Sequence, residues 1–154
     1  MSYLYLDTSA IVKRYTIEIG STWLQHLLDP NNGNTVVVSE ITLAEFAAAI
    51  SAKHRAGTIS LSDRTLIIDL FLSHCDIEYQ LVEVNRNIID RAVMLVQALP
   101  LRGYDSIQLS TALNSRDILA AVSITDFIFV CADTNLVASA FAEGLIVENP
   151  TDHP

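Results

Sequence analysis

The sequence predicts an α/β domain in which a central, mostly parallel sheet lies between helical layers. Apolar runs at 3–6, 35–38 and 127–131 show little apolar/polar alternation, which is typical of strands buried on both faces. Segments with helical periodicity separate these runs, and such alternation of strand and helix favours parallel strands. The 154 residues contain no repeat or long linker, so we expect a single domain over residues 1–154.

The predicted elements follow one another along the whole chain. Strands are expected at Tyr3–Leu6, Thr35–Val38, Tyr79–Val84 and Phe127–Cys131, with a fifth candidate in "LIVENP" at 145–150. Helices are expected at Ser21–Leu28, Ile41–His54, Ser62–Leu72, Arg86–Leu99, Tyr104–Asn114 and Thr134–Glu143. Ser39, and either Ser60 or Ser62, occupy positions suited to helix N-caps. The segment 114–126 is expected to form either an additional helix or a partner-binding surface.

Composition disfavours several classes of protein: membrane and secreted proteins, zinc proteins, and proteins that bind nucleic acid by positive charge alone. No apolar stretch reaches the roughly 18 residues that span a bilayer, and the N-terminus lacks signal-peptide features, so we expect a cytoplasmic protein without membrane contact. Two cysteines and four histidines show no zinc-ligand spacing. The net charge of −9 disfavours electrostatic binding of nucleic acid unless cations mask some of the acids.

Two buried strands are each followed by an acid. Asp7 follows "YLYL" and Asp133 follows "FIFVCA", and small polar residues come next in both cases. Each acid alone reads as a helix N-cap. Because the carboxyl ends of parallel strands lie at one edge of a sheet, the pair also indicates a shared ligand site, and both acids are able to serve both roles.

Two further acids are candidates for the same site. Glu45 lies among alanines at helical spacing, where a buried carboxylate is costly without a partner and an exposed one is equally plausible. Asp105 stands at the start of a predicted helix, where acids are favoured by the helix dipole. Arg102, three residues earlier, is the least ordinary of the basic residues.

Four carboxylates in one cleft repel one another and therefore require protons or cations. Oxygen-only ligands select Mg²⁺ or Mn²⁺, which activate water and orient phosphates. Two such ions would neutralise the four acids and make a nucleic-acid substrate admissible. Local basic residues would assist, although most of them are expected to be solvated surface charges: Lys13, Arg14, Lys53, Arg55 and Arg102.

Four segments resemble the PIN domain family, and in particular its small VapC-type toxin ribonucleases. In chain order they are "YLYLDTSAIVKRY", "SEITLAEFAAAI", "LRGYDSIQLSTAL" and "FVCADTNLVASAFAEGL". The resemblance places the family's acidic quartet on Asp7, Glu45, Asp105 and Asp133, with Thr8 and Ser9 supporting the first acid.

The resemblance implies a three-layer α/β/α fold, Mg²⁺ or Mn²⁺ at the acids, and hydrolysis of RNA to 5′-phosphate and 3′-hydroxyl ends. It also implies a homodimer and inhibition by a cognate antitoxin whose tail packs over the cleft. Two positions depart from the family pattern. Cys131 stands where a hydroxyl residue is common, and Gln108 stands where histidine is common.

Two other functions remain open at the level of sequence. A catalytically silent PIN-like module would bind RNA or a protein without cutting, but it has no evident reason to keep four mutually repelling acids. A phosphotransfer domain on a similar sheet would need either a D-x-D motif or an acidic pair, and the sequence offers Asp7-Thr8-Ser9 instead.

Overall fold

A computed structural model of the chain describes residues 1–153 and contains one five-stranded sheet. Its strands are β1 (Tyr3–Leu6), β2 (Thr35–Ser39), β3 (Gln80–Val82), β4 (Phe127–Val130) and β5 (Ile146–Glu148). Their order across the sheet is β3-β2-β1-β4-β5, and every neighbouring pair is parallel. The predicted α/β class and the parallel central sheet are confirmed, and "LIVENP" does supply the fifth strand.

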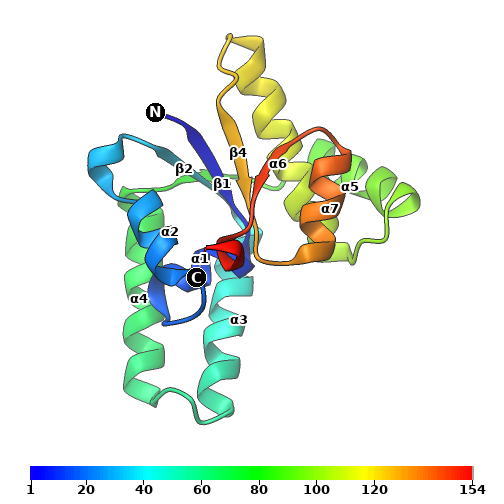
Figure 1. The fold of residues 1–154 in the computed structure, drawn as a ribbon. Helices are drawn as coiled ribbons and strands as arrows, with labels where there is room; N and C mark the ends of the chain where they lie inside the picture. The colour runs from blue at the N-terminus through cyan, green and yellow to red at the C-terminus, as the bar shows by residue number, and fades with distance from the viewer. Residues whose placement is uncertain (154) are drawn as a thin grey trace.

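Seven α-helices connect and cover the strands (Figure 1). They are α1 (Thr8–Tyr15), α2 (Ser21–Leu27), α3 (Ile41–Arg55), α4 (Leu61–Ile77), α5 (Arg86–Ala98), α6 (Gly103–Ala121) and α7 (Thr134–Ala142). Two short 3₁₀ helices lie at Pro30–Asn32 and Pro150–Asp152. Over residues 1–153, no helix combines the length and the apolar character that crossing a bilayer would require.

The sheet separates two apolar cores. Leu4 and Leu6 of β1 pack in a core with residues of α1 to α4, whereas Tyr5 packs in a second core with residues of α5 to α7. This division follows from the strand period of two, which points successive side chains to opposite faces. Figure 1 shows the two groups of helices on either side of the sheet. The fold is therefore the expected three-layer α/β/α arrangement.

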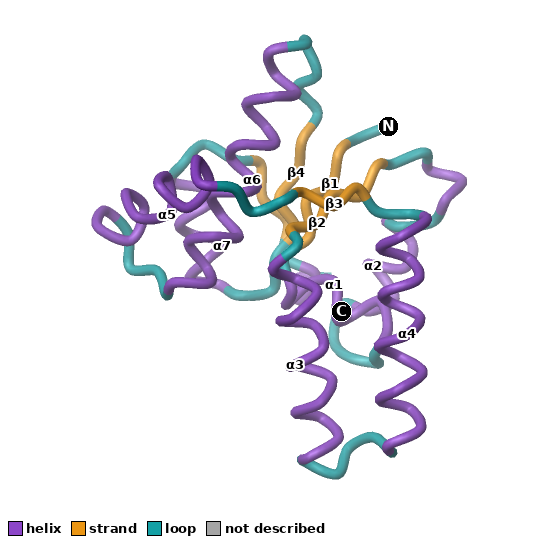
Figure 2. The backbone as a smooth tube through the Cα atoms, turned by 180° about the vertical axis from the view of Figure 1, so that it is seen from behind, coloured by secondary structure: helices purple, strands orange, loops and turns teal. Residues whose placement is uncertain are grey.

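Helices α3 and α4 form a long antiparallel pair that lies side by side in both views (Figure 2). The rings of Phe46 and Phe71 stack between them with centroids 3.9 Å apart. Ser60 is the N-cap of α4 and forms a capping box with Asp63. Of the two alternatives predicted for this cap, Ser60 and Ser62, the first is therefore confirmed. Ser39 is not a cap, because the N-cap position of α3 is Glu40 and the Ser39 hydroxyl is buried at the end of β2.

Several element boundaries differ from the prediction. Helix α4 begins one residue earlier and ends five residues later than expected, and β3 is shorter than the predicted strand Tyr79–Val84. The eight-residue α1 was not among the predicted helices. Helix α6 runs to Ala121, so the segment 114–126 mainly continues this helix (yellow in Figure 1). No glycine or proline interrupts this segment, and so nothing local ends the helix at Asn114.

Candidate metal centre

Asp7 combines a capping role with deep burial. Its Oδ1 accepts a hydrogen bond from the backbone N–H of Ala10 at 3.2 Å and from the Ser9 hydroxyl at 2.8 Å. The residue is 5% exposed. Burial raises the pKa of the carboxyl from 3.8 to about 6, because desolvation outweighs the hydrogen bonds from Ser9 and Ala10. A buried and desolvated carboxyl group is therefore placed at the carboxyl end of β1.

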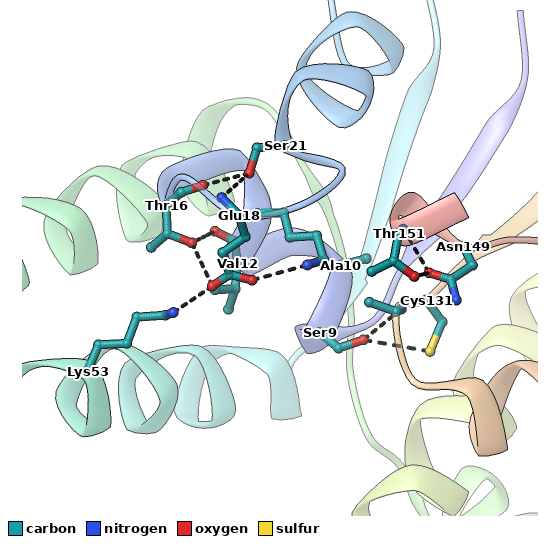
Figure 3. Close-up of polar contacts among 12 residues, drawn as sticks. Ser9, Ala10, Val12, Thr16, Glu18, Ser21, Lys53, Cys131, Asn149 and Thr151 are labelled. Carbon is teal, nitrogen blue, oxygen red and sulfur yellow. Dashed lines mark hydrogen bonds and ion pairs between the residues drawn. The ribbon is translucent and has the colours of Figure 1, made fainter. Parts of the chain in front are cut away.

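Ser9 connects this end of β1 to the end of β4. Its hydroxyl donates to Asp7 and accepts a hydrogen bond of 2.8 Å from the backbone N–H of Ala132. Figure 3 shows the Ser9 hydroxyl next to the Cys131 sulfur. The Cys131 Sγ lies 3.7 Å from the same hydroxyl and accepts from the backbone N–H of Asp133 at 3.3 Å. The side chain at position 131 thus supports the loop that carries the second acid.

Asp133 is the N-cap of α7, and it lies at the same edge of the sheet as Asp7. Its Oδ1 accepts from the backbone N–H groups of Asn135 and Leu136 at 2.9 and 3.0 Å, which caps α7. Because β1 and β4 are hydrogen-bonded neighbours with Leu6 opposite Val130, the segments that follow them meet at one edge of the sheet. The second oxygen, Oδ2, lies 3.5 Å from the guanidinium of Arg102.

Glu45 projects from α3 and is held by two donors. Thr8 donates to its Oε1 at 3.0 Å, and the Gln108 side-chain amide donates to the same atom at 2.7 Å. Burial raises the pKa of Glu45 despite these hydrogen bonds, and the nearby charge of Asp105 raises it further. The carboxylate is therefore fixed in a partly desolvated position near another acid.

Gln108 is a site residue that the sequence indicates only as a departure from the family pattern. It is 2% exposed, and its side-chain oxygen accepts from the Tyr5 hydroxyl at 2.7 Å. Its amide nitrogen lies within hydrogen-bonding distance of Glu45, of Thr42 at 2.9 Å and of Thr8 at 3.3 Å. The signal in the sequence is its spacing, because three residues after Asp105 is the same face of α6.

Arg102 joins the remaining pair of acids. Its Nε donates to Asp105 Oδ2 at 2.8 Å, and its NH2 reaches Asp133 at 3.5 Å. The Arg102 side chain is 79% exposed, whereas that of Asp105 is 19% exposed. Arg102 therefore places a solvent-facing positive charge across two of the four candidate ligands.

All four acids line one cavity with a volume of about 620 Å³. Thr8, Ser9 and Arg102 line it as well, and so the chain brings together every residue predicted for the site. Three charged residues also reach it: Lys13, Glu18 and Lys53. Lys13 is only 6% exposed and is therefore not one of the solvated surface charges expected among the basic residues.

The donor set suits a hard cation, but the carboxylates do not enclose one. Among residues 1–153, no three His, Cys, Asp or Glu side chains converge closely enough to hold an ion. Ser9, Gln108 and Arg102 each form a hydrogen bond with an oxygen of a candidate ligand. Four carboxylates with hydroxyl neighbours still match the all-oxygen preference of Mg²⁺ and Mn²⁺, and the desolvated charge of Asp7 favours a cation there.

Comparisons with known proteins identify a family and several structures of similar fold. The family model described as "PIN domain" matches residues 4–127. No curated protein sequence matches the chain. Among solved structures, VapBC2 from Rickettsia felis, bound to a DNA fragment from its promoter, has a TM-score of 0.63 and 18% identity, and 96% of this chain and 98% of that chain are covered.

Two other solved structures are also similar to the chain over nearly its whole length. A toxin–antitoxin complex from Klebsiella pneumoniae has a TM-score of 0.63 and 18% identity, covering 96% of this chain and 97% of that chain. DNA-bound VapBC from Salmonella typhimurium has a TM-score of 0.59 and 15% identity, covering 97% and 99%. At these identities the likeness shows a shared fold.

Proposed function

The chain belongs to the PIN domain family, and from this membership we propose that it is a Mg²⁺- or Mn²⁺-dependent endoribonuclease that hydrolyses RNA phosphodiester bonds. One observation carries the proposal. Four carboxylates line a single cavity at the carboxyl edge of the sheet: Asp7 directly after β1, Glu45 of α3, Asp105 of α6, and Asp133 in the loop after β4. Such a cluster is unfavourable without cations, and Mg²⁺ with acidic ligands is suited to phosphodiester hydrolysis.

The proposed roles divide the four acids. Asp7 and Asp105 are the principal ligands of the first ion, while Asp133 and Glu45 complete its site, orient its waters or hold a second ion. When bound, the metal supplies activated water for in-line attack and stabilises the charge on the leaving 3′-oxygen. Gln108 and Thr8 hold the Glu45 carboxylate in one orientation. Arg102 places one positive charge between Asp105 and Asp133, and we propose that its exposed side chain turns toward an incoming phosphate.

Substitution of the principal ligands tests the assignment. We expect Asp7→Asn and Asp105→Asn each to abolish Mg²⁺-dependent cleavage of single-stranded RNA while the circular dichroism spectrum stays unchanged. Asp90→Asn, which removes an exposed acid of α5 outside the cavity, serves as the matched control and should cleave normally. Undiminished cleavage by both cavity variants would refute the proposal.

A silent PIN-like module is the second candidate, and the ion pairs of Arg102 favour it, because they occupy ligand oxygens. Thermal unfolding with added MnCl₂ separates the two functions. A metal-dependent enzyme gains stability as the ion binds, by about 2.7 kcal/mol at a hundredfold excess over the dissociation constant. A silent module without a metal site shows no such gain.

We also propose that the protein is the toxin of a toxin–antitoxin pair in the cytoplasm, inhibited by a cognate antitoxin. The support is the shared fold with VapBC and other toxin–antitoxin structures. A short neighbouring gene for a DNA-binding protein, and loss of cleavage on adding its product, would bear this out. An active enzyme that its neighbour's product leaves unaffected would contradict it.

An exposed apolar surface supports a homodimer. Val93, Met94, Val96 and Tyr104 are between 39% and 70% exposed. All but Met94 line an apolar cavity of about 620 Å³ that adjoins the acids at Glu45 and Asp105. Contiguous apolar surface of this kind commonly marks an interface. A monomer in analytical ultracentrifugation at micromolar concentration would contradict the dimer.

A further inference from the structure

Both lysines of the chain meet at one glutamate inside the acid cavity. Lys13 and Lys53 are the only lysines in the sequence. The Lys13 Nζ lies 3.1 Å from Glu18 Oε2, and the Lys53 Nζ lies 2.5 Å from Glu18 Oε1. Figure 3 shows Lys53 reaching from α3 to Glu18, which lies in the loop after α1.

The loop holds Glu18 firmly in this position. Its backbone N–H donates to the Ser21 hydroxyl at 2.9 Å, and that hydroxyl donates to the carbonyl oxygen of Thr16 at 2.8 Å. The Thr16 hydroxyl in turn donates to Glu18 Oε1 at 3.1 Å. Burial alone would raise the pKa of Glu18, but the hydrogen bonds from Lys53 and Lys13 lower it below its usual value, so the bridge is ionic.

The cavity consequently has two electrostatically different ends. Helix α1 begins at Asp7 and carries Lys13 six residues later, about 9 Å further along its axis. Helix α3 carries Glu45 and then Lys53, eight residues or about 12 Å further on. Ala48 and Ala49, which lie between Glu45 and Lys53 on α3, line the cavity with small side chains. The four candidate ligands lie at one end of the cavity, and Lys13 and Lys53, paired with Glu18, lie at the other.

A buried lysine requires a reason in a protein of net charge −9. Lys13 gives up most of its hydration, and Glu18 alone cannot balance both ammonium groups, so the cluster of three keeps one net positive charge. A phosphate can take the place of the Glu18 carboxylate, because both are anionic oxygen acceptors for a lysine ammonium.

We propose that Lys13 and Lys53 form a phosphate-binding subsite for the RNA strand next to the scissile phosphodiester, and that Glu18 holds the lysines in place until that phosphate displaces it. This inference rests on the proposed function, since it assumes an RNA strand in the cavity. If the scissile phosphate of an RNA strand lies at the four acids, a neighbouring phosphate of that RNA lies further along the cavity, at the end with the two lysines. The subsite contributes binding energy and fixes the position of the RNA along the cavity, and the acids take part in the hydrolysis.

The salt dependence of RNA binding tests the subsite. A fluorescent single-stranded RNA oligonucleotide is titrated with the Asp105→Asn protein in Mg²⁺ at several KCl concentrations, with anisotropy as the readout. Each lost phosphate contact should reduce the slope of log K against log[salt] by about 0.7. We expect that decrease, with weaker binding, when Lys53→Met is added. Arg86→Gln removes an exposed positive charge outside the cavity and should leave the slope unchanged.

Glu18→Gln separates a phosphate subsite from a purely structural bridge. If Glu18 competes with the RNA phosphate, removing its charge strengthens RNA binding and steepens the salt slope, even if the protein becomes less thermostable. If the bridge only fastens the loop to α3, the variant lowers the melting temperature without strengthening binding. The second result, or an unchanged slope in Lys53→Met, would overturn the inference.

The outcomes also distinguish this inference from the proposed function. Acid-dependent RNA cleavage by the native protein, with no change in slope on losing Lys53, rejects the subsite and keeps the nuclease. A changed slope in a native protein that does not cleave RNA rejects the nuclease and keeps the binding site. Failure of the protein to bind RNA at all rejects both.

Discussion

Asp7 and Asp133 show that an acid that caps a helix can also line the candidate metal cavity. In each residue one oxygen accepts backbone N–H groups at the start of a helix. This requirement fixes where each carboxylate lies, at the end of β1 or just after β4. The capping and site interpretations of the sequence therefore do not compete, because the helix that an acid caps also positions that acid in the cavity.

Gln108 provides a prediction at the residue scale. Gln108→Leu removes a donor to Glu45 and the acceptor for the Tyr5 hydroxyl, so we expect RNA cleavage to fall by about 10- to 100-fold, as for other residues that orient metal ligands. Gln108→His keeps one ring nitrogen as a donor and the other as an acceptor, and should restore part of the rate. Both kcat and the Mn²⁺ affinity are measured.

A merely structural role for Gln108 predicts another pattern. Both variants would then lose stability in proportion to their loss of packing, and the Mn²⁺ affinity of the folded protein would not change. Equal Mn²⁺ affinity in the native protein and in Gln108→Leu would contradict the orienting role.

At the scale of elements, α3 contributes side chains to both ends of the acid-lined cavity. Glu45 lies in its first half and Lys53 near its end, and α4 supports it through the stacked rings of Phe46 and Phe71. Phe71 is fully buried, whereas Leu70, its neighbour on α4, is 46% exposed. The stability of this helix pair therefore depends on one face of α4.

This packing yields a stability prediction. Phe71→Ala should lower the free energy of unfolding by about 3–5 kcal/mol, because it leaves a cavity between α3 and α4. Leu70→Ala, the control on the exposed side of the same helix, should cost far less. The comparison is made by urea denaturation, and equal losses in the two variants would show that α4 does not pack as described.

The sequence predicts the elements better than their ends. Uninterrupted apolar runs identify the buried strands, and the acids that follow them indicate the sheet edge that carries the site. The predicted helix Tyr104–Asn114 is shorter than α6, which ends at Ala121. Its continuation beyond Asn114 depends on the absence of a glycine or proline that would end it, and an absence is a weak signal. Helix α1 was missed because eight residues give a weak periodic signal.

Side-chain partners were less predictable than side-chain positions. The burial of Lys13 depends on Glu18, which comes from a loop, and the contacts of Gln108 depend on Tyr5, which is 103 residues away. Neither pairing has a local signature. The four acids could be placed together because strand ends and helix faces follow general rules, but the donors that hold them could not.

At the scale of the whole molecule, the sheet order brings distant segments to one edge. β1 lies between β2 and β4, so the acids after β1 and β4 meet there, and α3 and α6 add one acid each. Positive charge is concentrated at two points of the same cavity, Arg102 beside the acids and the lysine pair beyond them. An acidic protein can bind a polyanion in this way, with its acids covered by cations and its few lysines placed in the binding cavity.

The central claim is that the four carboxylates bind a divalent cation. Anomalous diffraction from a crystal of the native protein soaked in MnCl₂ tests it most directly. We expect a manganese peak with oxygen atoms of Asp7 and Asp105 about 2.1 Å from it, and with Arg102 turned away from Asp105. The absence of any manganese among the four side chains, with Arg102 still paired to Asp105 and Asp133, would contradict the account.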